Sequence, residues 1–341
     1  MKILILGVNG FIGSHLAERI LSTTDWEIRG HDMKATNLGA CLSDPRFSLR
    51  QNDMRKDCDW IESQVAECDL VLPLVAVAQP KTYVEDPLFI FELDFEENLK
   101  IVRHCVKYRK RLVFPSTSEV YGMSRDAEFK EDESNLVLGP ICKTRWIYSC
   151  SKQMLDRVIA AYGMQRGLRY TLFRPFNWLG PRLDDYSLAS EGKSRVLTQF
   201  IYNVLNDLPI QLVGGGEQKR CFTDIDDGIG ALMAILRNEG NVADSQIFNI
   251  GNPRNNHSVR ELAETLVRVL STFPSFREKA LKAIILDTPS STYYGEGYED
   301  VVYRVPSIEK ARRLLGWEPR FSLEETIRKT ISSMFCTENP S

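Results

Sequence analysis

Two short groups of polar residues have the types and spacing for proton and hydride transfer. Tyr148 and Lys152 are four residues apart in a segment of helical character, so both lie on one helix face. A nearby ammonium stabilises a tyrosinate and lowers the pKa of the tyrosine from its usual value of about 10. Such a tyrosine can take a proton from a substrate hydroxyl as hydride leaves the carbon. Thr117 or Ser118, at the end of an expected strand, can hydrogen-bond the same oxygen. Because a Tyr-x-x-x-Lys pair alone is often only a solvated helix face, its meaning depends on the rest of the chain.

The N-terminal segment supplies the context, since it has the order of a dinucleotide site. An apolar run over residues 2–6 is followed at once by Gly7, Gly10 and Gly13, then by a helical pattern and a second strand that ends at Asp32. Glycines let the backbone approach a pyrophosphate, which the N-terminus of the helix attracts. A carboxylate at Asp32 can hold ribose hydroxyls and would repel a 2′-phosphate, which favours NAD over NADP. The alternative, a glycine turn that binds nothing, is disfavoured by this order of elements.

Apolar runs and helical segments alternate through the first half of the chain. The expected strands cover residues 2–6, 27–31, 47–50, 70–75, 112–114 and 170–174. The expected helices between them cover residues 60–66, 91–108 and 149–166. This alternation predicts the α/β class, with a doubly wound parallel sheet of the Rossmann type.

The rhythm changes after about Pro181, which predicts a smaller α/β lobe that binds substrate. We therefore expect an NAD-binding domain over residues 1–180, a substrate lobe over 181–335 that can partly rejoin the sheet, and a tail over 336–341. Helices are expected over residues 194–206, 227–238, 258–272 and 307–315. A short strand pair is expected between residues 210–213 and 246–250.

Composition excludes several classes of protein. The 341 residues carry a net charge of −3 and 43% hydrophobic residues, which indicates neither a nucleic-acid nor an anionic-membrane surface. No stretch reaches the roughly 18 apolar residues of a membrane span, and no secretion signal precedes the first strand. The eight cysteines form no Cys-x-x-Cys pair and the four histidines lack metal-ligand spacing. We therefore expect a cytoplasmic protein with reduced thiols and no metal.

Four motifs together resemble the extended short-chain dehydrogenases of the epimerase/dehydratase family, which act on nucleotide sugars. They are GVNGFIG over residues 7–13, TSEVYG over 117–122, YSCSK over 148–152 and RPFN over 174–177. Within that family the chain most resembles UDP-glucuronic acid decarboxylase domains, such as that of the bifunctional polymyxin-resistance enzyme, from Met1 to about Phe335. The most distinctive segments for this resemblance are residues 91–99, 145–149, 218–224 and 293–298.

The resemblance implies a set of cofactor and substrate contacts. Those expected for NAD are Gly7, Gly10, Phe11, Ile12, Gly13, Asp32, Asp53, Met54, Ala76, Tyr148 and Lys152. Those expected for the UDP-sugar are Ala78, Tyr83, Thr117, Ser118, Arg145, Asn177, Gln211, Lys219, Arg220 and Tyr298. Taken alone, Asp53 could equally be a turn residue, and Lys219 with Arg220 a solvated basic turn.

Glu119 and Arg304 distinguish a decarboxylase within this resemblance. Epimerases of the group usually carry a small residue where Glu119 stands, and Arg304 matches the arginine assigned to protonation after carbon dioxide leaves. Since arginine is essentially never deprotonated, Arg304 can instead orient a water, stabilise an enolate or bind the substrate carboxylate.

The function implied is NAD-dependent oxidation of UDP-glucuronic acid at C4, followed by loss of the C5 carboxylate as carbon dioxide. The product is a UDP-4-keto-pentose, which can be released or reduced to UDP-xylose. The alternatives are a UDP-xylose synthase, a UDP-sugar 4-epimerase or dehydratase, and a non-enzymatic NAD-sensing regulator of the same fold. The resemblance also implies a homodimer or higher homo-oligomer, paired through the helices near residues 91–108 and 149–166.

Overall fold

The first strand is apolar on both of its faces, which places it inside a sheet covered on two sides. In β1 (Lys2–Leu6), the side chains of Ile3 and Ile5 enter one hydrophobic cluster, and those of Leu4 and Leu6 enter another. All four side chains are completely buried. Because successive residues of a strand point to opposite faces, this pattern requires helices on both sides of the sheet.

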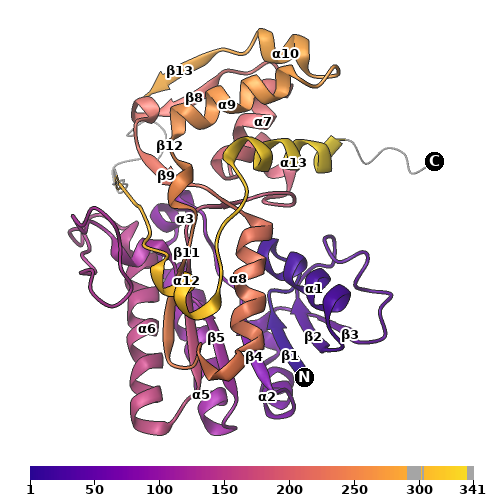
Figure 1. Cartoon of the computed structure of the whole chain (residues 1–341), viewed down its shortest axis with the longest axis vertical. Helices are drawn as coiled ribbons and strands as arrows, with labels where there is room; N and C mark the ends of the chain where they lie inside the picture. The colour runs from indigo at the N-terminus through magenta and orange to yellow at the C-terminus, as the bar shows by residue number, and fades with distance from the viewer. Residues whose placement is uncertain (290–300, 302, 336–341) are drawn as a thin grey trace.

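The computed structural model describes residues 1–289, 301 and 303–335, and its centre is a seven-stranded sheet (Figure 1). The strand order is β11-β6-β5-β4-β1-β2-β3, and every neighbouring pair is parallel. Its other strands are β2 (Glu27–Asp32), β3 (Phe47–Gln51), β4 (Leu70–Pro73), β5 (Arg111–Pro115), β6 (Tyr170–Pro175) and β11 (Gln246–Ile250). This confirms the α/β class with a Rossmann-type parallel sheet, whose carboxyl edge is where ligands bind in such folds.

Helices cover the sheet on both faces, as doubly wound folds require. One face is covered by α1 (Phe11–Thr23), α8 (Ile225–Arg237) and α12 (Glu309–Leu315). The other is covered by α2 (Cys58–Glu67), α5 (Asn98–Lys107) and α6 (Trp146–Arg166). The sheet therefore takes two of its covering helices, α8 and α12, from the second half of the chain.

The prediction of one regular helix over residues 91–108 is wrong in part, because a π-helical turn interrupts the helix there. The segment consists of α4 (Pro87–Phe91), a π-helical turn η2 (Glu92–Glu97) and α5, preceded by α3 (Pro80–Glu85). The Asn98 side chain donates hydrogen bonds to the carbonyls of Leu93, at 3.1 Å, and Asp94, at 3.4 Å. A side chain inserted into the backbone ladder is a recognised cause of such a local widening.

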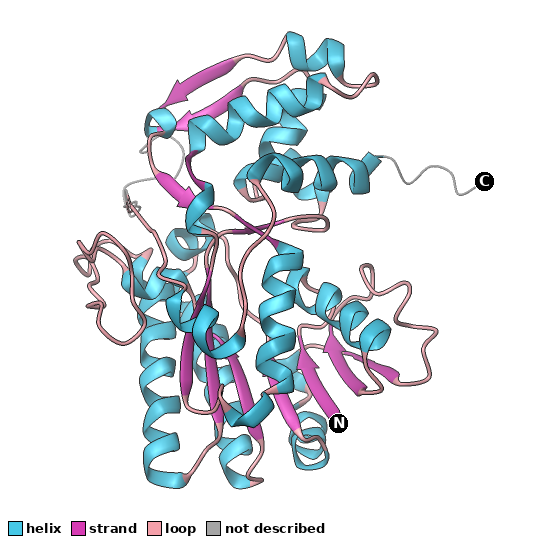
Figure 2. Cartoon of the chain, viewed as in Figure 1, coloured by secondary structure: helices cyan, strands magenta, loops and turns pink. Residues whose placement is uncertain are grey.

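A smaller lobe lies beyond the carboxyl edge of the sheet, at the top of Figure 1. Its helices are α7 (Val196–Leu205), α9 (Val259–Ser271), α10 (Arg277–Leu281) and α13 (Leu323–Phe335), which share one hydrophobic cluster. Figure 2 shows the parallel strands β8 (Ile210–Val213) and β13 (Ile285–Thr288) at the margin of this lobe.

The expected pairing of residues 210–213 with 246–250 is therefore wrong. Strand β11 instead extends the main sheet beside β6, in register from Gln246 opposite Thr171 to Ile250 opposite Pro175. The apolar pattern of each strand was recognisable, but such a pattern does not specify the partner strand. Segment 246–250 rejoins the sheet because Phe248 and Ile250 are completely buried within the cluster that also holds α8.

Short elements connect the two parts of the molecule. Strand β7 (Trp178–Leu179) runs parallel to β10 (Thr223–Asp224), and β9 (Lys219–Cys221) runs antiparallel to β12 (Asn256–Ser258). The short 3₁₀ helices are η1 (Met54–Lys56), η3 (Ser118–Tyr121), η4 (Tyr186–Glu191), η5 (Gly214–Gly216), η6 (Glu239–Asn241) and η7 (Pro253–Asn255). Among the described residues, no helix has the length and apolarity needed to cross a membrane.

Candidate active site

The turn between β1 and α1 fits a dinucleotide pyrophosphate. Gly7 has φ +81°, a left-handed conformation that side chains disfavour, and a Cβ there would lie 3.0 Å from the backbone nitrogen of Val75. A Cβ on Gly13 would lie 2.4 Å from the carbonyl oxygen of Gly7. Gly10 is the N-cap of α1, and no side chain caps the first turn of that helix. The turn thus presents backbone N–H groups without a competing side chain, the arrangement that binds phosphate at a helix N-terminus.

Asp32 lies at the end of β2 beside this turn. Its carboxylate accepts a hydrogen bond of 2.9 Å from the Asn9 N–H and one of 3.2 Å from the Lys34 N–H. The carboxylate is therefore fixed next to the glycine turn, where it can accept ribose hydroxyls. These residues fit NAD.

The other expected cofactor residues differ in exposure and contacts. The Asp53 carboxylate caps η1 and pairs with Arg55 at 2.7 Å, as a turn residue does. Met54 is buried in the core between the sheet and its helices. Phe11 and Ile12 begin α1, with the guanidinium of Arg195 5.3 Å from the centre of the Phe11 ring.

Tyr148 and Lys152 lie on the first turns of α6, facing the end of β5. Both side chains are buried, and the Lys152 ammonium donates a hydrogen bond of 3.1 Å to the carbonyl oxygen of Pro115. The Tyr148 hydroxyl is hydrogen-bonded to Thr117, and the Tyr148 ring stacks on Tyr83 with a centroid distance of 4.6 Å. The structure thus brings the expected tyrosine, lysine, threonine and Tyr83 together.

The pKa of Tyr148 differs in direction from the expectation based on spacing. Burial raises its pKa well above the usual value, and the Asp94 carboxylate raises it further, whereas the bond to Thr117 opposes the change. Burial lowers the pKa of Lys152, against the opposing charges of Asp94 and Asp156. Because the phenol and the ammonium are both desolvated, the chain by itself holds Tyr148 in its protonated form.

Glu119 forms a second centre with two arginines. Its carboxylate accepts a hydrogen bond of 2.6 Å from Nη2 of Arg145, and its other oxygen pairs with Nη1 of Arg304. Burial would raise the pKa of Glu119, but the charges of Arg304 and Arg145 outweigh it and hold that pKa far below its usual range. The side chains of Arg145 and Arg304 are only 2% and 3% exposed and that of Glu119 is 20% exposed, so the two cations are buried and the anion is partly open to solvent.

Three separate parts of the chain supply this cluster. Glu119 is on η3, two residues after Thr117, and Arg145 is the residue before α6, three positions ahead of Tyr148. Arg304 comes from the segment before α12, 185 residues away from Glu119. Because Glu119 is close in sequence to Thr117 and Arg145 is close to Tyr148, the cluster lies next to the Tyr148–Lys152 pair.

The remaining expected substrate residues differ in their positions. Arg220 on β9 donates hydrogen bonds of 2.8 Å to the carbonyls of Lys219 and Val301, and its charge lowers the pKa of Glu119. Asn177, with φ +41°, follows β6. Ser118 is buried beside Glu119, and Ala76 and Ala78 follow β4. Lys219 is exposed on β9 and Gln211 is exposed on β8. Tyr298 lies outside the described residues.

Sequence reasoning assigned no role in the site to Asp94, Asp156 or Arg174, although Asp94 and Arg174 lie in segments that carry the family resemblance. The Asp94 side chain is completely buried on η2, and burial raises its pKa to about 6. Asp156, one turn beyond Lys152 on α6, accepts hydrogen bonds from Ser116 at 2.7 Å and Arg174 at 3.1 Å. The four-residue step from Lys152 to Asp156 could have suggested the second acid, whereas nothing local indicated that Asp94 is buried.

A glycine turn after β1 and a Tyr–Lys pair facing the end of β5 define a nicotinamide-dependent protein of the Rossmann class. A family model described as the NAD dependent epimerase/dehydratase family matches residues 3–251. The chain belongs to this family of NAD-dependent enzymes, and NAD is its cofactor.

Solved structures share the fold over nearly the whole chain. The PbgP3 protein from Burkholderia pseudomallei is 50% identical, covers 98% of this chain and 96% of its own, and superposes with a TM-score of 0.89. A UDP-glucuronic acid 4-epimerase from Bacillus cereus, in complex with UDP-glucuronic acid and NAD, is 23% identical with coverages of 98% and 99% and a TM-score of 0.81. A dTDP-glucose 4,6-dehydratase from Bacillus anthracis, in complex with NAD, is 20% identical with coverages of 99% and 97% and a TM-score of 0.79.

Proposed function

We propose that this protein catalyses the NAD-dependent oxidative decarboxylation of UDP-glucuronic acid to a UDP-4-keto-pentose. The observation that carries the proposal is the pairing of Glu119 with Arg145 and Arg304 beside Tyr148 and Lys152. Two desolvated guanidinium groups suit a substrate that brings its own carboxylate, because arginine binds carboxylates through two parallel hydrogen bonds.

The first step is removal of a proton and a hydride from the C4 alcohol of the sugar. NAD, when bound, is the oxidant for that alcohol and adds a positive charge to the site. The chain alone keeps Tyr148 protonated, so the positive charge of bound NAD and the ammonium of Lys152 would favour its phenolate form. In that form Tyr148 takes the hydroxyl proton on its phenolic oxygen, and Thr117 orients the same hydroxyl by a hydrogen bond. Lys152, held by the carbonyl of Pro115, stabilises the phenolate.

The second step is loss of the neighbouring carboxylate. Oxidation at C4 makes a β-keto acid, and departure of carbon dioxide leaves an enolate whose charge the new carbonyl shares. Arg304 and Arg145 stabilise negative charge at this stage, and Glu119 keeps the two arginines in place before substrate enters. Because a guanidinium is not deprotonated in proteins, Arg304 orients the water that supplies the final proton.

The UDP moiety is assigned to the lobe beyond the sheet edge. Lys219 and Arg220 supply positive charge for the pyrophosphate, and Asn177, Gln211 and Tyr298 are proposed contacts to the nucleotide. Residues 1–180 would then mainly bind NAD and carry the Tyr–Lys pair, whereas residues 181–335 would mainly bind the UDP-sugar.

A UDP-glucuronic acid 4-epimerase is the second candidate, because one similar structure has that activity and contains that substrate with NAD. A UDP-xylose synthase is a variant of the first candidate that reduces the ketone before release. The buried Tyr148–Lys152 pair favours an enzyme over an NAD-sensing regulator, since binding alone does not require it.

The test is to incubate the protein with UDP-glucuronic acid and NAD and to follow carbon dioxide, NAD reduction and product mass. A decarboxylase releases carbon dioxide and yields a pentose nucleotide. One equivalent of reduced NAD per product indicates release of the ketone, and none indicates UDP-xylose. An unchanged hexuronate mass with a new stereoisomer indicates the epimerase, and no conversion at all contradicts an enzyme acting on this substrate.

We also propose a homodimer formed through the helical segment near residues 91–108, which α4 leads into, and through α6. Leu88 on α4 and Met154 and Met164 on α6 are exposed by 70%, 48% and 82%, so a partner subunit on these helices would bury apolar surface. Sedimentation velocity should show a dimer that Met154→Glu converts to monomer. A monomeric wild-type protein at micromolar concentration contradicts this assembly.

A further inference from the structure

A short bridge holds the backbone directly after Arg304. The Phe129 N–H donates to the carbonyl of Val305 at 2.7 Å, and the Ser307 N–H donates to the carbonyl of Phe129 at 2.8 Å. Phe129 and Pro306 thus form an isolated parallel β-bridge. Because an arginine side chain is long and flexible, the position of its guanidinium beside Glu119 depends on this anchoring.

Asn249, in strand β11, ties both partners of the bridge to the sheet. Its side-chain amide donates to the carbonyl of Phe129 at 2.9 Å and to that of Ser307 at 3.3 Å. Its side-chain oxygen accepts a hydrogen bond of 2.8 Å from the hydroxyl of Tyr121. Asn249 is completely buried, so loss of its amide would leave carbonyls without solvent to replace it.

Tyr121 connects this anchor to the turn that carries Glu119. It is the last residue of η3, its ring stacks on Phe129 at 4.5 Å, and its hydroxyl accepts a hydrogen bond of 2.9 Å from Arg174. Arg174 in turn pairs with Asp156 at 3.1 Å, one helical turn after Lys152. A continuous buried network therefore runs from the helix of the Tyr–Lys pair to the segment of Arg304.

We propose that Tyr121 and Asn249 are positioning residues that hold Arg304 against Glu119 for the carboxylate-handling half of the reaction. Neither residue is among the groups assigned to substrate or cofactor, so each acts through the backbone of the Arg304 segment. The catalytic consequence rests on the proposed function, whereas the anchoring itself does not.

The variants are Tyr121→Phe, which removes one hydroxyl and keeps the ring packing, and Asn249→Ala. One matched control is Tyr108→Phe, which loses a 2.9 Å hydrogen bond to Glu62. The other is Asn203→Ala, which loses a part-buried hydrogen bond of 2.8 Å to the carbonyl of Pro209 and one of 2.9 Å from the side chain of Gln199. Tyr108 ends α5 and Asn203 is on α7, away from the network. The first readout is amide hydrogen exchange of the protein without ligands.

The anchoring predicts faster exchange in peptides that contain Phe129 and in those covering residues 303–315 for both variants, and no such change for the controls. Unchanged exchange in these peptides overturns the proposal, and so does an equal increase throughout the protein. Hydrogen exchange tests the anchoring independently of the reaction. If the wild-type protein does not oxidise UDP-glucuronic acid, that result contradicts the proposed function and leaves the test of the anchoring intact.

The second readout separates the two chemical steps in a single turnover. Loss of one hydrogen bond corresponds to roughly three- to tenfold in rate. We expect Tyr121→Phe to slow carbon dioxide release by about that factor while NAD reduction stays near the wild-type rate, so that quenched samples accumulate the 4-keto-hexuronic acid. Equal slowing of both steps overturns the specific link to Arg304.

Discussion

At the scale of single residues, the site contains two buried titratable groups in opposite charge states. The Tyr148 phenol is kept protonated by burial and by a nearby carboxylate, whereas Glu119 is kept ionised by two arginines. Burial penalises charge in both cases, so the difference comes from the neighbours. The Tyr148 phenol is therefore neutral and the Glu119 carboxylate charged, although both side chains lie in the same part of the site.

The Tyr148 hydroxyl is expected to be necessary for turnover and dispensable for NAD binding. Tyr148→Phe removes the proton acceptor and keeps the stacking on Tyr83, so kcat should fall by about 10²–10⁴. Fluorescence titration with NAD should give a Kd close to that of the wild type. Tyr108→Phe, at the end of α5, should keep full activity. Wild-type turnover in Tyr148→Phe would refute the assignment.

Glu119→Gln should lower stability in a pH-dependent way. Removing the anion takes the Glu119 carboxylate away from two buried guanidinium groups, those of Arg145 and Arg304, at a cost of about 3 kcal/mol in the free energy of unfolding. Since the pKa of Glu119 is depressed in the fold, its contribution is complete above its unfolded-state pKa of about 4.3 and is lost as pH falls further below that.

Urea unfolding of the wild type and of Glu119→Gln should therefore differ most at neutral pH and converge below about pH 4. Glu133→Gln is the control, because the pair of Glu133 with Lys130 is exposed and contributes at most about 1 kcal/mol. A stability difference that grows in acid would contradict the depressed pKa.

At the scale of elements, the carboxyl ends of parallel strands gather the site. Gly7 follows β1, Asp32 ends β2 and Thr117 follows β5, so residues far apart in sequence meet at one edge. The η2 turn adds Asp94 from the helix packed beside α6. The irregular turn thus places a carboxylate where a regular helix would present a different residue.

Gly13→Ala tests the tight packing of α1 against the glycine turn. Gly13 has ordinary helical geometry, so the effect is steric: the new Cβ would lie 2.4 Å from the Gly7 oxygen and 2.8 Å from the Val8 Cα. We expect a loss of about 1–3 kcal/mol in stability and an NAD affinity weaker by about tenfold or more. Calorimetric NAD titration and urea unfolding measure both. Gly39→Ala is the matched control, because a Cβ there meets nothing within 4 Å.

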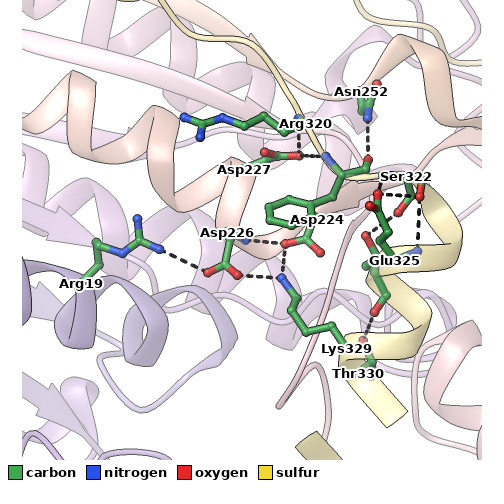
Figure 3. A network of polar contacts seen from close by, with 12 residues as sticks. Arg19, Asp224, Asp226, Asp227, Asn252, Arg320, Ser322, Glu325, Lys329 and Thr330 are labelled. Carbon is green, nitrogen blue, oxygen red and sulfur yellow. Dashed lines mark hydrogen bonds and ion pairs between the residues drawn. The ribbon is translucent and has the colours of Figure 1, made fainter. Parts of the chain in front are cut away.

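At the scale of the whole molecule, an ionic network joins the lobe to the sheet (Figure 3). Lys329 on α13 pairs with Asp226, at 2.7 Å, and with the completely buried Asp224. Asp226 also pairs with Arg19 on α1, at 3.4 Å. Helices α1, α8 and α13 are thereby linked across the boundary between the two parts of the chain.

Lys329→Met should destabilise the protein, because it leaves the Asp224 carboxylate buried without its ammonium. We expect a loss of about 2–3 kcal/mol, below the full cost of breaking a wholly buried pair because Lys329 is 29% exposed. Thermal unfolding measures the change. Lys282→Met, which breaks an exposed pair with Glu278, should cost less than about 0.5 kcal/mol. Equal effects of the two substitutions would show that the network contributes nothing specific.

Much of the fold and part of the site follow from local patterns. The apolar runs, the glycines after β1 and the four-residue step from Tyr148 to Lys152 each act over a few residues, through steric limits and helix geometry. These features are encoded in short segments, so the sequence by itself determined the sheet class, the NAD turn and the Tyr–Lys pair.

Only the tertiary structure decided the partners across long stretches of chain. Arg304 pairs with Glu119 across 185 residues of sequence, and Asn249 accepts a hydrogen bond from Tyr121 across 128. Strand β11 pairs with β6 rather than with β8. Periodicity shows which side chains are buried but not which ones they meet, because that choice depends on the packing of the whole core. The burial of Asp94 and the raised pKa of Tyr148 follow from the same packing.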